Sequence, residues 1–270
     1  MNKINMHIHT NISDGMHDYK KVILECIKSG LEIISITDHD NVEKLKEILE
    51  FSNKKNIEII SGVELTANYP NGVCHVLGYN IDIDMINEFN KYIKHNRILK
   101  AKKIISVLNK LRYEINYNEV LKNSCNDIIG RRDIAKILVL KKYFDNEDSV
   151  IKELFKKDKP AYFKTKSKSI QECVDVIKDS GGIAVIAHPW TLNLSIEELK
   201  KFILKYKFDG IEVYNHNISY DSYEELNKLA DNLNIYKTCG TDYHGKTDFN
   251  DLVVGQDVDC NKILNKIIVR

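Results

Sequence analysis

Short β-rich runs alternate with longer amphipathic segments along most of this chain, and this alternation limits the fold more than any other feature. The candidate strands occupy residues 3–10, 31–37, 57–63, 73–80, 183–187, 208–214 and 235–240. The segments that place Leu, Ile and Val three or four residues apart, as helices do, are 17–29, 42–54, 169–180, 195–206 and 219–233. This pattern predicts parallel strands joined by crossover helices, either in a barrel or in an open doubly wound sheet.

One region interrupts the alternation. Residues 84–168 show helical patterns and no convincing strand, which predicts a helical insertion in a barrel formed by residues 1–83 and 169–270. The distal part of the insertion is rich in lysine, namely Lys152, Lys156, Lys157, Lys159, Lys164, Lys166 and Lys168. These lysines form either a solvated surface or a local site for a polyanion.

The composition is that of an ordinary folded protein, with 43% hydrophobic and 29% charged residues among 270. Lys and Arg number 40 against 39 Asp and Glu, so no overall field favours long duplex nucleic acid or a membrane surface. The chain has neither a signal-like start nor an apolar run of membrane-spanning length, so we expect a cytoplasmic protein. The cysteines form no C-x-x-C pair, which predicts reduced and mostly buried thiols at Cys26, Cys74, Cys125, Cys173, Cys239 and Cys260.

Histidines and carboxylates lie at or just beyond the ends of the predicted strands. The first strand ends in Met6-His7-Ile8-His9, and strand alternation places His7 and His9 on the same face. The later motifs carry, in chain order, Asp14, His39, Glu64, His75, His188, Asp242 and His244. Because the carboxyl ends of parallel strands meet at one edge, we expect these side chains to gather there. Imidazole and carboxylate ligands without thiolates favour manganese, iron or zinc.

Several of these positions also have ordinary structural explanations. Asp40 precedes a helical run and is predicted to be its N-cap. Asp38 is a candidate for orienting a ligating histidine from behind. Asp14 before Gly15 is also a typical turn residue. Since these explanations would have to hold independently at every strand end, the whole set favours a metal site.

The motifs resemble those of the PHP (polymerase and histidinol phosphatase) domain family. They are, in family order, H-x-H-T with S-D-G, I-T-D-H-D, G-V-E, C-H-V-L-G-Y, G-G-I-A-V-I-A-H-P, G-I-E-V-Y-N and D-Y-H-G. The similarity covers most of the chain and is greatest to stand-alone bacterial phosphoesterases that act on nucleotide phosphates and on the 5′ ends of short RNA. It implies a distorted seven-stranded (β/α) TIM-like barrel that holds up to three divalent metal ions, with manganese expected first and iron or zinc as alternatives.

The resemblance also implies roles for individual residues. One ion would be held by His7, His9, Glu64 and Asp242, and Glu64 would bridge to a second ion held by His75 and His188. The third ion would be held by Asp14, His39 and His244. In the insertion, which would form a substrate-binding cap, Arg131 matches an arginine that meets substrate phosphate. Relatives commonly show G-R-P-H there, whereas this chain has Arg132 and Asp133 after Arg131.

The resulting hypothesis is a metal-dependent phosphoesterase in which a hydroxide held by the metal ions attacks phosphorus. The expected substrate is a nucleoside 3′,5′-bisphosphate or a short single-stranded RNA with a 5′-phosphate. The alternatives are a small-molecule phosphomonoesterase such as histidinol phosphatase and a non-catalytic binding module stabilised by metal. His216, after the sixth predicted strand, is a candidate substrate contact or an exposed loop residue. The sequence assigns neither a general acid nor an oligomeric state.

Overall fold

The computed structural model describes residues 3–52, 55–70, 72–124, 129–163, 168–216, 218–245, 248–254 and 258–268. It divides into two compact units, one formed by residues 1–89 with 168–270 and the other by residues 90–167. Within the described ranges, no helix has the length and apolar character needed to span a bilayer.

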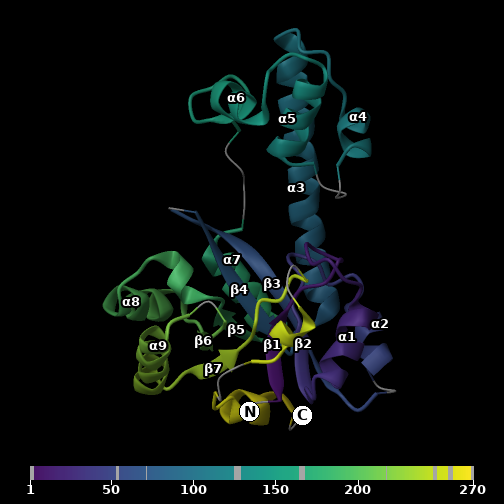
Figure 1. Cartoon of the computed structure of the whole chain (residues 1–270). Helices are drawn as coiled ribbons and strands as arrows, with labels where there is room; N and C mark the ends of the chain where they lie inside the picture. Colours follow the sequence, from purple (N-terminus) through teal and green to yellow (C-terminus); the bar gives the residue numbers. More distant parts are fainter. Residues whose placement is uncertain are drawn as a thin grey trace. The chain divides into compact units, whose positions relative to one another are not determined.

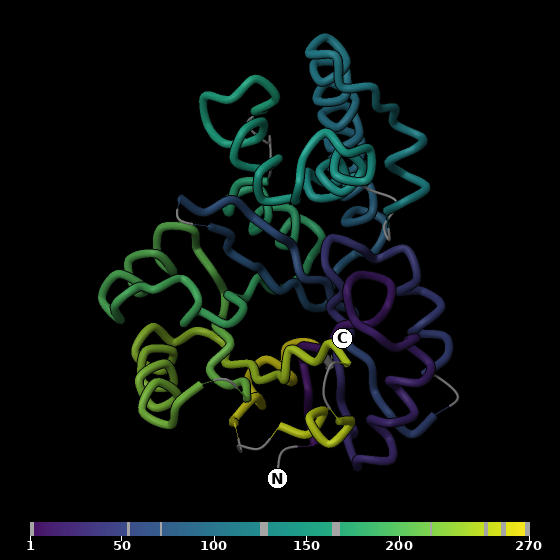
Figure 2. Tube along the Cα trace, turned by 45° about the horizontal axis from the view of Figure 1, so that its top comes forward, coloured from purple at the N-terminus to yellow at the C-terminus, as the bar shows by residue number. Residues whose placement is uncertain are grey.

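The first unit is built on a seven-stranded sheet whose strands follow one another in chain order. The strands are β1 (Ile4–Ile8), β2 (Ile33–Ile36), β3 (Glu58–Tyr69), β4 (Gly72–Tyr79), β5 (Ile183–Ile186), β6 (Gly210–Tyr214) and β7 (Tyr236–Cys239). Ile8, at the end of β1, bridges to Tyr243, just beyond β7, so the two edges of the sheet meet. Figure 2 shows the C-terminal trace in yellow beside the N-terminal strand in purple. The barrel prediction is therefore confirmed over the open sheet.

The prediction that all strands are parallel is wrong at β4. This strand pairs antiparallel with both β3 and β5, whereas the other neighbouring strands pair in parallel. β3 ends at Tyr69 and β4 begins at Gly72, and a parallel crossover needs a dozen or more residues. So short a connection permits only a hairpin.

Helices cover the outer face of the sheet (Figure 1). They are α1 (Tyr19–Lys28), α2 (Leu45–Ser52), α7 (Ile170–Asp179), α8 (Ile196–Tyr206), α9 (Tyr220–Leu233) and α10 (Asn261–Ile268). Two short 3₁₀ turns follow strand ends, η2 (Pro189–Leu192) and η3 (Phe249–Leu252). The α7 and α8 helices start with capping boxes, Ser169 with Glu172 and Ser195 with Glu198, which satisfy the first free backbone donors. The sequence patterns predicted the first five helices but neither α10 nor the 3₁₀ turns.

The second unit is helical. It contains most of α3 (Ile83–Lys110), together with α4 (Tyr117–Lys122), α5 (Arg131–Leu140), α6 (Glu147–Val150) and the π-helical turn η1 (Ile151–Phe155). Its own hydrophobic core includes Ile104, Leu108, Ile134, Leu138 and Phe155. Because this core contains no residue of the first unit, residues 90–167 have the apolar burial expected of a separately packed unit.

Candidate metal centre

The end of the barrel where β1 finishes brings together the residues that the strand ends predicted. In a first group, the Nε2 atoms of His7 and His9 lie 3.1 Å apart. The carboxylate of Glu64 approaches them at 3.4 and 3.2 Å, and that of Asp242 at 3.3 and 3.2 Å. His7, His9 and Glu64 are completely buried. The group offers four ligand atoms close enough for one ion.

The second group shares Glu64. Its Oε1 atom lies 3.1 Å from His75 Nδ1 and 3.1 Å from His188 Nε2, and these two nitrogens are 3.2 Å apart. Oε2, the oxygen that faces His7 and His9, lies 3.0 Å from His39 Nδ1. The two oxygens of Glu64 therefore face different sets of histidines, which is the geometry that a bridging carboxylate needs.

The third group is more open to solvent. Asp14 lies 3.3 Å from His244 Nε2, 3.8 Å from His39 Nε2 and 3.7 Å from His9 Nδ1. The side chain of Asp14 is 54% exposed, whereas those of His9 and Glu64 in the same centre are fully buried. His39 and His9 thus contact more than one group, while Asp14 and His244 belong to this one.

Three histidines are each fixed by a hydrogen bond at one ring nitrogen. His7 Nδ1 lies 3.0 Å from Glu212 Oε1, and His244 Nδ1 donates to the carbonyl of Asp242 at 2.7 Å. His188 Nδ1 lies 3.1 Å from the hydroxyl of Thr191, which itself donates to the His188 carbonyl. In the neutral rings these partners place the proton on Nδ1, which leaves the lone pair of Nε2 facing the carboxylates of the centre.

Charge within the centre shifts several pKa values. Burial alone would raise the pKa of Glu64, but charged His7 and hydrogen bonds from His188, His7 and His75 hold it well below the usual range. Burial would lower the pKa of His9, yet its bonds to Asp242 and Glu64 raise it to about 9. Burial lowers the pKa of His39 to about 4. The site is therefore a strongly coupled group of acids and bases, as functional sites often are.

Two ligand-bearing loops adopt an unusual backbone. Asp242 and His188 have positive φ angles of 52° and 25°, which cost non-glycine residues about 1–3 kcal/mol each. Beside them, a Cβ atom at Gly240 would overlap the Cβ atom of His7, so only glycine lets the end of β7 pass this close to β1. The local strain aims the side chains of the strand ends into one place.

His75 reaches the centre by a route that the sequence interpretation did not anticipate. It lies within β4, opposite Thr66 of β3, and not at the carboxyl end of a parallel strand. Because β4 runs backwards, its first half lies beside the second half of β3, and the carbonyl of His75 accepts a hydrogen bond from Ala187 next to His188. The expected position of His75 at the end of a parallel strand was therefore wrong, and its role as a ligand stays a prediction.

The N-cap prediction for Asp40 is wrong. Helix α2 begins only at Leu45, and Asp40 has a φ angle of 50°. Its carboxylate accepts hydrogen bonds from the backbone of Thr66 at 3.0 Å and from Lys168 Nζ at 2.7 Å. Lys168 is only 2% exposed, so it does not belong to a solvated lysine surface either.

Within the described part of the chain, Asp38 makes its hydrogen bonds to a loop and not to a histidine. Its carboxylate accepts hydrogen bonds from the backbone and hydroxyl of Thr10, at 2.8 and 2.7 Å, and from the hydroxyl of Ser13 at 2.7 Å. These bonds hold the turn that carries Asp14. The pKa of Asp38 is raised by burial, although the three bonds oppose this shift.

Neither of the two predicted substrate contacts is a member of these groups of candidate ligands. His216 is exposed, and its Nε2 lies 2.9 Å from the carbonyl of Val253. Arg131 is the first residue of α5 in the helical unit, where its guanidinium donates to the carbonyl of Phe155 at 3.4 Å. Asp133 accepts a hydrogen bond from the backbone of Gly130 at 2.7 Å. Asp133, at which this chain departs from the G-R-P-H motif of its relatives, therefore caps the start of α5. Cys125 lies outside the described residues, and the other five cysteines are buried thiols that form no disulfide with one another.

Glu212 was missed as a functional residue by the sequence interpretation. It is completely buried on β6, where it contacts His7 Nδ1 and accepts a hydrogen bond from the backbone of His188 at 2.6 Å. One carboxylate therefore positions two predicted ligands. A signal was present, because Glu212 is an acidic residue in an otherwise apolar strand, Gly210–Tyr214.

Replacing Glu212 with glutamine is expected to lower metal affinity and turnover by about 10- to 100-fold, as for other residues that orient ligating histidines. The amide keeps the shape but loses the charge that stabilises the His7 ring in its orientation. Calorimetric titration of the metal-free variant with metal ions would measure the loss of affinity. Unchanged affinity in the Glu212→Gln variant would show that Glu212 only packs.

The residues fit divalent metal ions. His9 Nδ1, His39 Nδ1 and Glu64 Oε2 are buried, and within the described residues none of these atoms makes a well-aligned hydrogen bond, although Oε2 lies 3.0–3.4 Å from three histidine nitrogens. Lone pairs facing one another at 3.0–3.4 Å repel unless positive charge lies between them. The set of imidazoles and carboxylates, without thiolates, suits manganese, iron or zinc.

A nearly closed barrel with groups of histidine and carboxylate at one end defines a metal-binding barrel protein. The chain belongs to the PHP domain family, whose model matches residues 5–183. This match confirms the resemblance inferred from the motifs.

The chain is similar over most of its length to curated and solved proteins. A 5′-3′ exoribonuclease of Haemophilus influenzae is 24% identical over 247 residues, which cover 90% of each chain. A 3′,5′-nucleoside bisphosphate phosphatase of Chromobacterium violaceum is 25% identical over 250 residues, covering 90% of this chain and 88% of the relative. The structure of an amidohydrolase from the same organism, with bound sulfate and no metal, has a TM-score of 0.68 and 25% identity and covers 95% of this chain and 91% of its own.

Proposed function

We propose that this protein is a metal-dependent phosphoesterase that hydrolyses phosphate esters of nucleotides. It would act as a nucleoside 3′,5′-bisphosphate phosphatase, as a 5′-3′ exoribonuclease on short single-stranded RNA, or as both. The observation that carries the proposal is that His7, His188 and His244 are each fixed at Nδ1 and present Nε2 to carboxylates. The names of the relatives in Haemophilus influenzae and Chromobacterium violaceum support nucleotide substrates.

The cofactor we propose is a set of three divalent ions, with manganese first and iron or zinc as alternatives. The proposed ligand sets are His7, His9, Glu64 and Asp242 for one ion, Glu64, His75 and His188 for the second, and Asp14, His39 and His244 for the third. When bound, such ions supply a nucleophile from water at neutral pH and offset the charge on phosphate oxygens.

The protein's own residues would hold the ligands in place and contact the substrate. Glu212 and the Thr191 hydroxyl hold His7 and His188 in place, so the ligands need not reorganise during the reaction. Asp14 is the most exposed of the predicted ligands, so substrate would approach from its side of the centre. Arg131 would pair with phosphate through its planar guanidinium, and His216 would contact the substrate or leaving group.

Product analysis by chromatography tests the proposal. The purified protein with Mn²⁺ is incubated with adenosine 3′,5′-bisphosphate and, separately, with a short 5′-phosphorylated RNA. We expect phosphate from the first, mononucleotides from the 5′ end of the second, or both. Asp14→Ala, which removes a ligand, should lower turnover by about tenfold or more, whereas exposed Asp179→Ala on α7 should not.

Other results would contradict this function. Absence of turnover on both substrates, with metal bound, would exclude the nucleotide hypothesis and favour histidinol phosphate or another small phosphomonoester. Nucleotide binding without turnover, equal in the wild type and in Asp14→Ala, would indicate a binding module.

A further inference from the structure

Lys168 forms a buried ion pair with Asp40. Its Nζ atom lies 2.7 Å from Asp40 Oδ1, and the Lys168 side chain is 1% exposed, against 21% for Asp40. The ammonium group also lies 5.0 Å from the centre of the Phe89 ring. Lysine is almost never buried so completely unless it is paired, because its charge loses hydration. The pair therefore indicates that Lys168 has a role inside the first unit.

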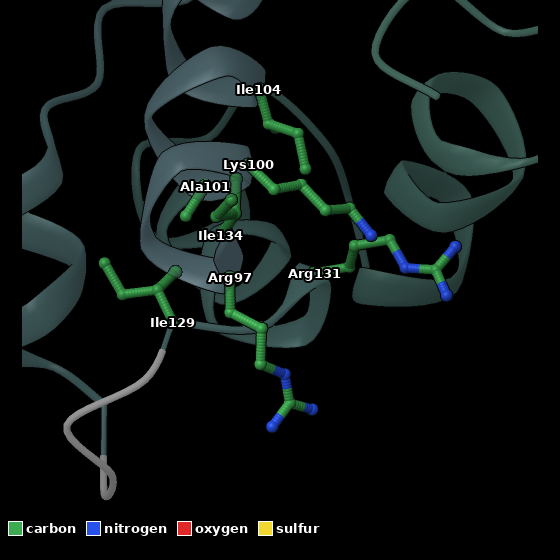
Figure 3. A pocket seen from close by; sticks show the side chains of 8 residues that line it. Arg97, Lys100, Ala101, Ile104, Ile129, Arg131 and Ile134 are labelled. Atoms are coloured by element: carbon green, nitrogen blue, oxygen red, sulfur yellow. The ribbon is translucent and has the colours of Figure 1, made fainter. Parts of the chain in front are cut away.

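The setting of Lys168 differs from that of the basic residues in the helical unit. Arg97, Lys100 and Arg131 line a pocket there, and Figure 3 shows their side chains around it. The ammonium group of Lys168 instead faces a carboxylate of the protein and is shielded from solvent. Lys168 is therefore placed to hold Asp40 and not to meet a ligand that arrives from solvent.

Asp40 belongs to the loop that carries His39, one of the candidate ligands. The backbone N–H of Asp40 donates to the carbonyl of Glu64 at 2.9 Å, and the carboxylate of Asp40 accepts from the backbone of Thr66 at 3.0 Å. His39 itself forms a parallel β-bridge with Glu64. These contacts attach the loop to β3 beside Glu64, whose Oε2 lies 3.0 Å from His39 Nδ1.

The backbone conformation of Asp40 depends on its contacts. Its φ angle of 50° lies in the left-handed region, which is unfavourable for residues other than glycine and persists where the surroundings fix it. Here the surroundings are Glu64, Thr66 and Lys168. Lys168 is the charged partner among these three, so its loss would leave the partly buried carboxylate without this counter-charge. Water would then compete for the carboxylate and loosen the loop that carries His39.

Lys168 is also anchored through its backbone. Its carbonyl accepts a hydrogen bond from the backbone of Asn68 at 2.8 Å. Lys168 is the first residue of the first unit after residues 90–167, and Phe89 is the last residue before them. The points at which the chain leaves and rejoins the first unit therefore meet at the Lys168 side chain. A lysine that is fixed in this way can hold Asp40 in a defined place.

We propose that Lys168 is a positioning residue of the metal centre, which fixes the loop of His39 through its ion pair with Asp40. The inference rests on the proposed function, because it assumes that the centre binds divalent ions. It deepens that function, because neither Lys168 nor Asp40 belongs to a proposed ligand set. The action is indirect, since the ion pair sets the place of His39, which is the proposed ligand.

Two measurements on the metal-free full chain test the inference without depending on turnover. They are calorimetric titration with Mn²⁺ and the ring-proton NMR signal of His39, which is read without metal and assigned with His39→Gln. The variants are Lys168→Met, Asp40→Asn, which keeps the side-chain shape and tolerates a positive φ angle, and both changes together. Lys46→Met is the matched control, because Lys46 also pairs with an aspartate at 2.7 Å but is 59% exposed. Circular dichroism verifies that each variant is folded.

We expect Lys168→Met to weaken the binding of at least one Mn²⁺ ion by about tenfold and to shift the His39 signal. Lys46→Met should stay within about twofold of the wild type. Asp40→Asn should cause a loss similar to that of Lys168→Met. The double variant should bind Mn²⁺ no more weakly than either single variant, because both changes break the same pair and the double change leaves no unpaired charge. If Lys168→Met does not fold, the double variant should still show the loss of about tenfold relative to the wild type.

Unchanged Mn²⁺ affinity and an unchanged His39 signal in Lys168→Met, with only a lower free energy of unfolding, would overturn the inference, because the pair would then serve stability alone. Losses that add in the double variant would overturn the route through Asp40. A wild type that binds Mn²⁺ and variants that show the expected losses, together with absent turnover on both nucleotide substrates, would refute the proposed function and leave the positioning role in place.

Discussion

Replacing Glu64 with glutamine is expected to reduce turnover by about a thousandfold or more, which exceeds the effect of losing a residue that only orients a ligand. Both oxygens of Glu64 face histidine nitrogens, at 3.1 Å on the side of His75 and His188 and at 3.0 Å on the side of His39. The amide removes the negative charge and directs N–H donors toward nitrogens that need an ion between them. We therefore also expect loss of at least one bound metal ion.

The measurement combines metal content by mass spectrometry with initial rates on adenosine 3′,5′-bisphosphate. Glu197→Gln is the matched control, since it makes the same chemical change on the exposed surface of α8. Full metal content and wild-type rates in Glu64→Gln would refute the bridging role. A folded variant that has lost metal and turnover, beside a normal Glu197→Gln, would support it.

The sequence was sufficient to predict the strands and the candidate ligands because both depend on local patterns. Each strand is a short apolar run, and each candidate ligand follows or lies within such a run in a short motif. His7 and His9 illustrate the point, since alternation along β1 alone places them on one face, and their Nε2 atoms lie 3.1 Å apart. The alternation of strands with amphipathic helices along the chain also indicated that both faces of the strands are buried.

What the sequence did not predict depends on contacts between distant segments. The direction of β4 follows from the length of the connection after Tyr69, which the strand patterns alone do not specify. Asp40 has the residue type and the sequence position expected of an N-cap, but its hydrogen-bond partners, Thr66 and Lys168, lie 26 and 128 residues away. Glu212 likewise acts on His7, 205 residues away. Local propensity predicts none of these pairings.

The stability of the metal-free protein is expected to fall as pH rises from about 6.5 to about 9. The pKa of His9 is raised from its ordinary value to about 9, so its contribution is fully present below 6.5 and is lost as the folded form deprotonates. A shift of this size corresponds to about 3 kcal/mol. The pKa values of His7 and His188 are also raised, by carboxylates that outweigh burial, and act in the same direction.

Below pH 6.5 the slope should reverse, because burial lowers the pKa of His39 to about 4. In that window the unfolded chain binds the extra proton, so stability rises with pH and reaches its maximum near 6.5. Urea unfolding of the chelator-treated protein between pH 4 and 9.5 would measure both limbs. His9→Gln should flatten the upper limb, whereas His95→Gln, at an exposed position on α3, should leave it unchanged. Stability that stays constant or rises between pH 6.5 and 9 would contradict the assignment. Since metal ions bind neutral imidazole, the same protons must leave on metal binding, and apparent metal affinity should rise over the range in which the metal-free protein weakens.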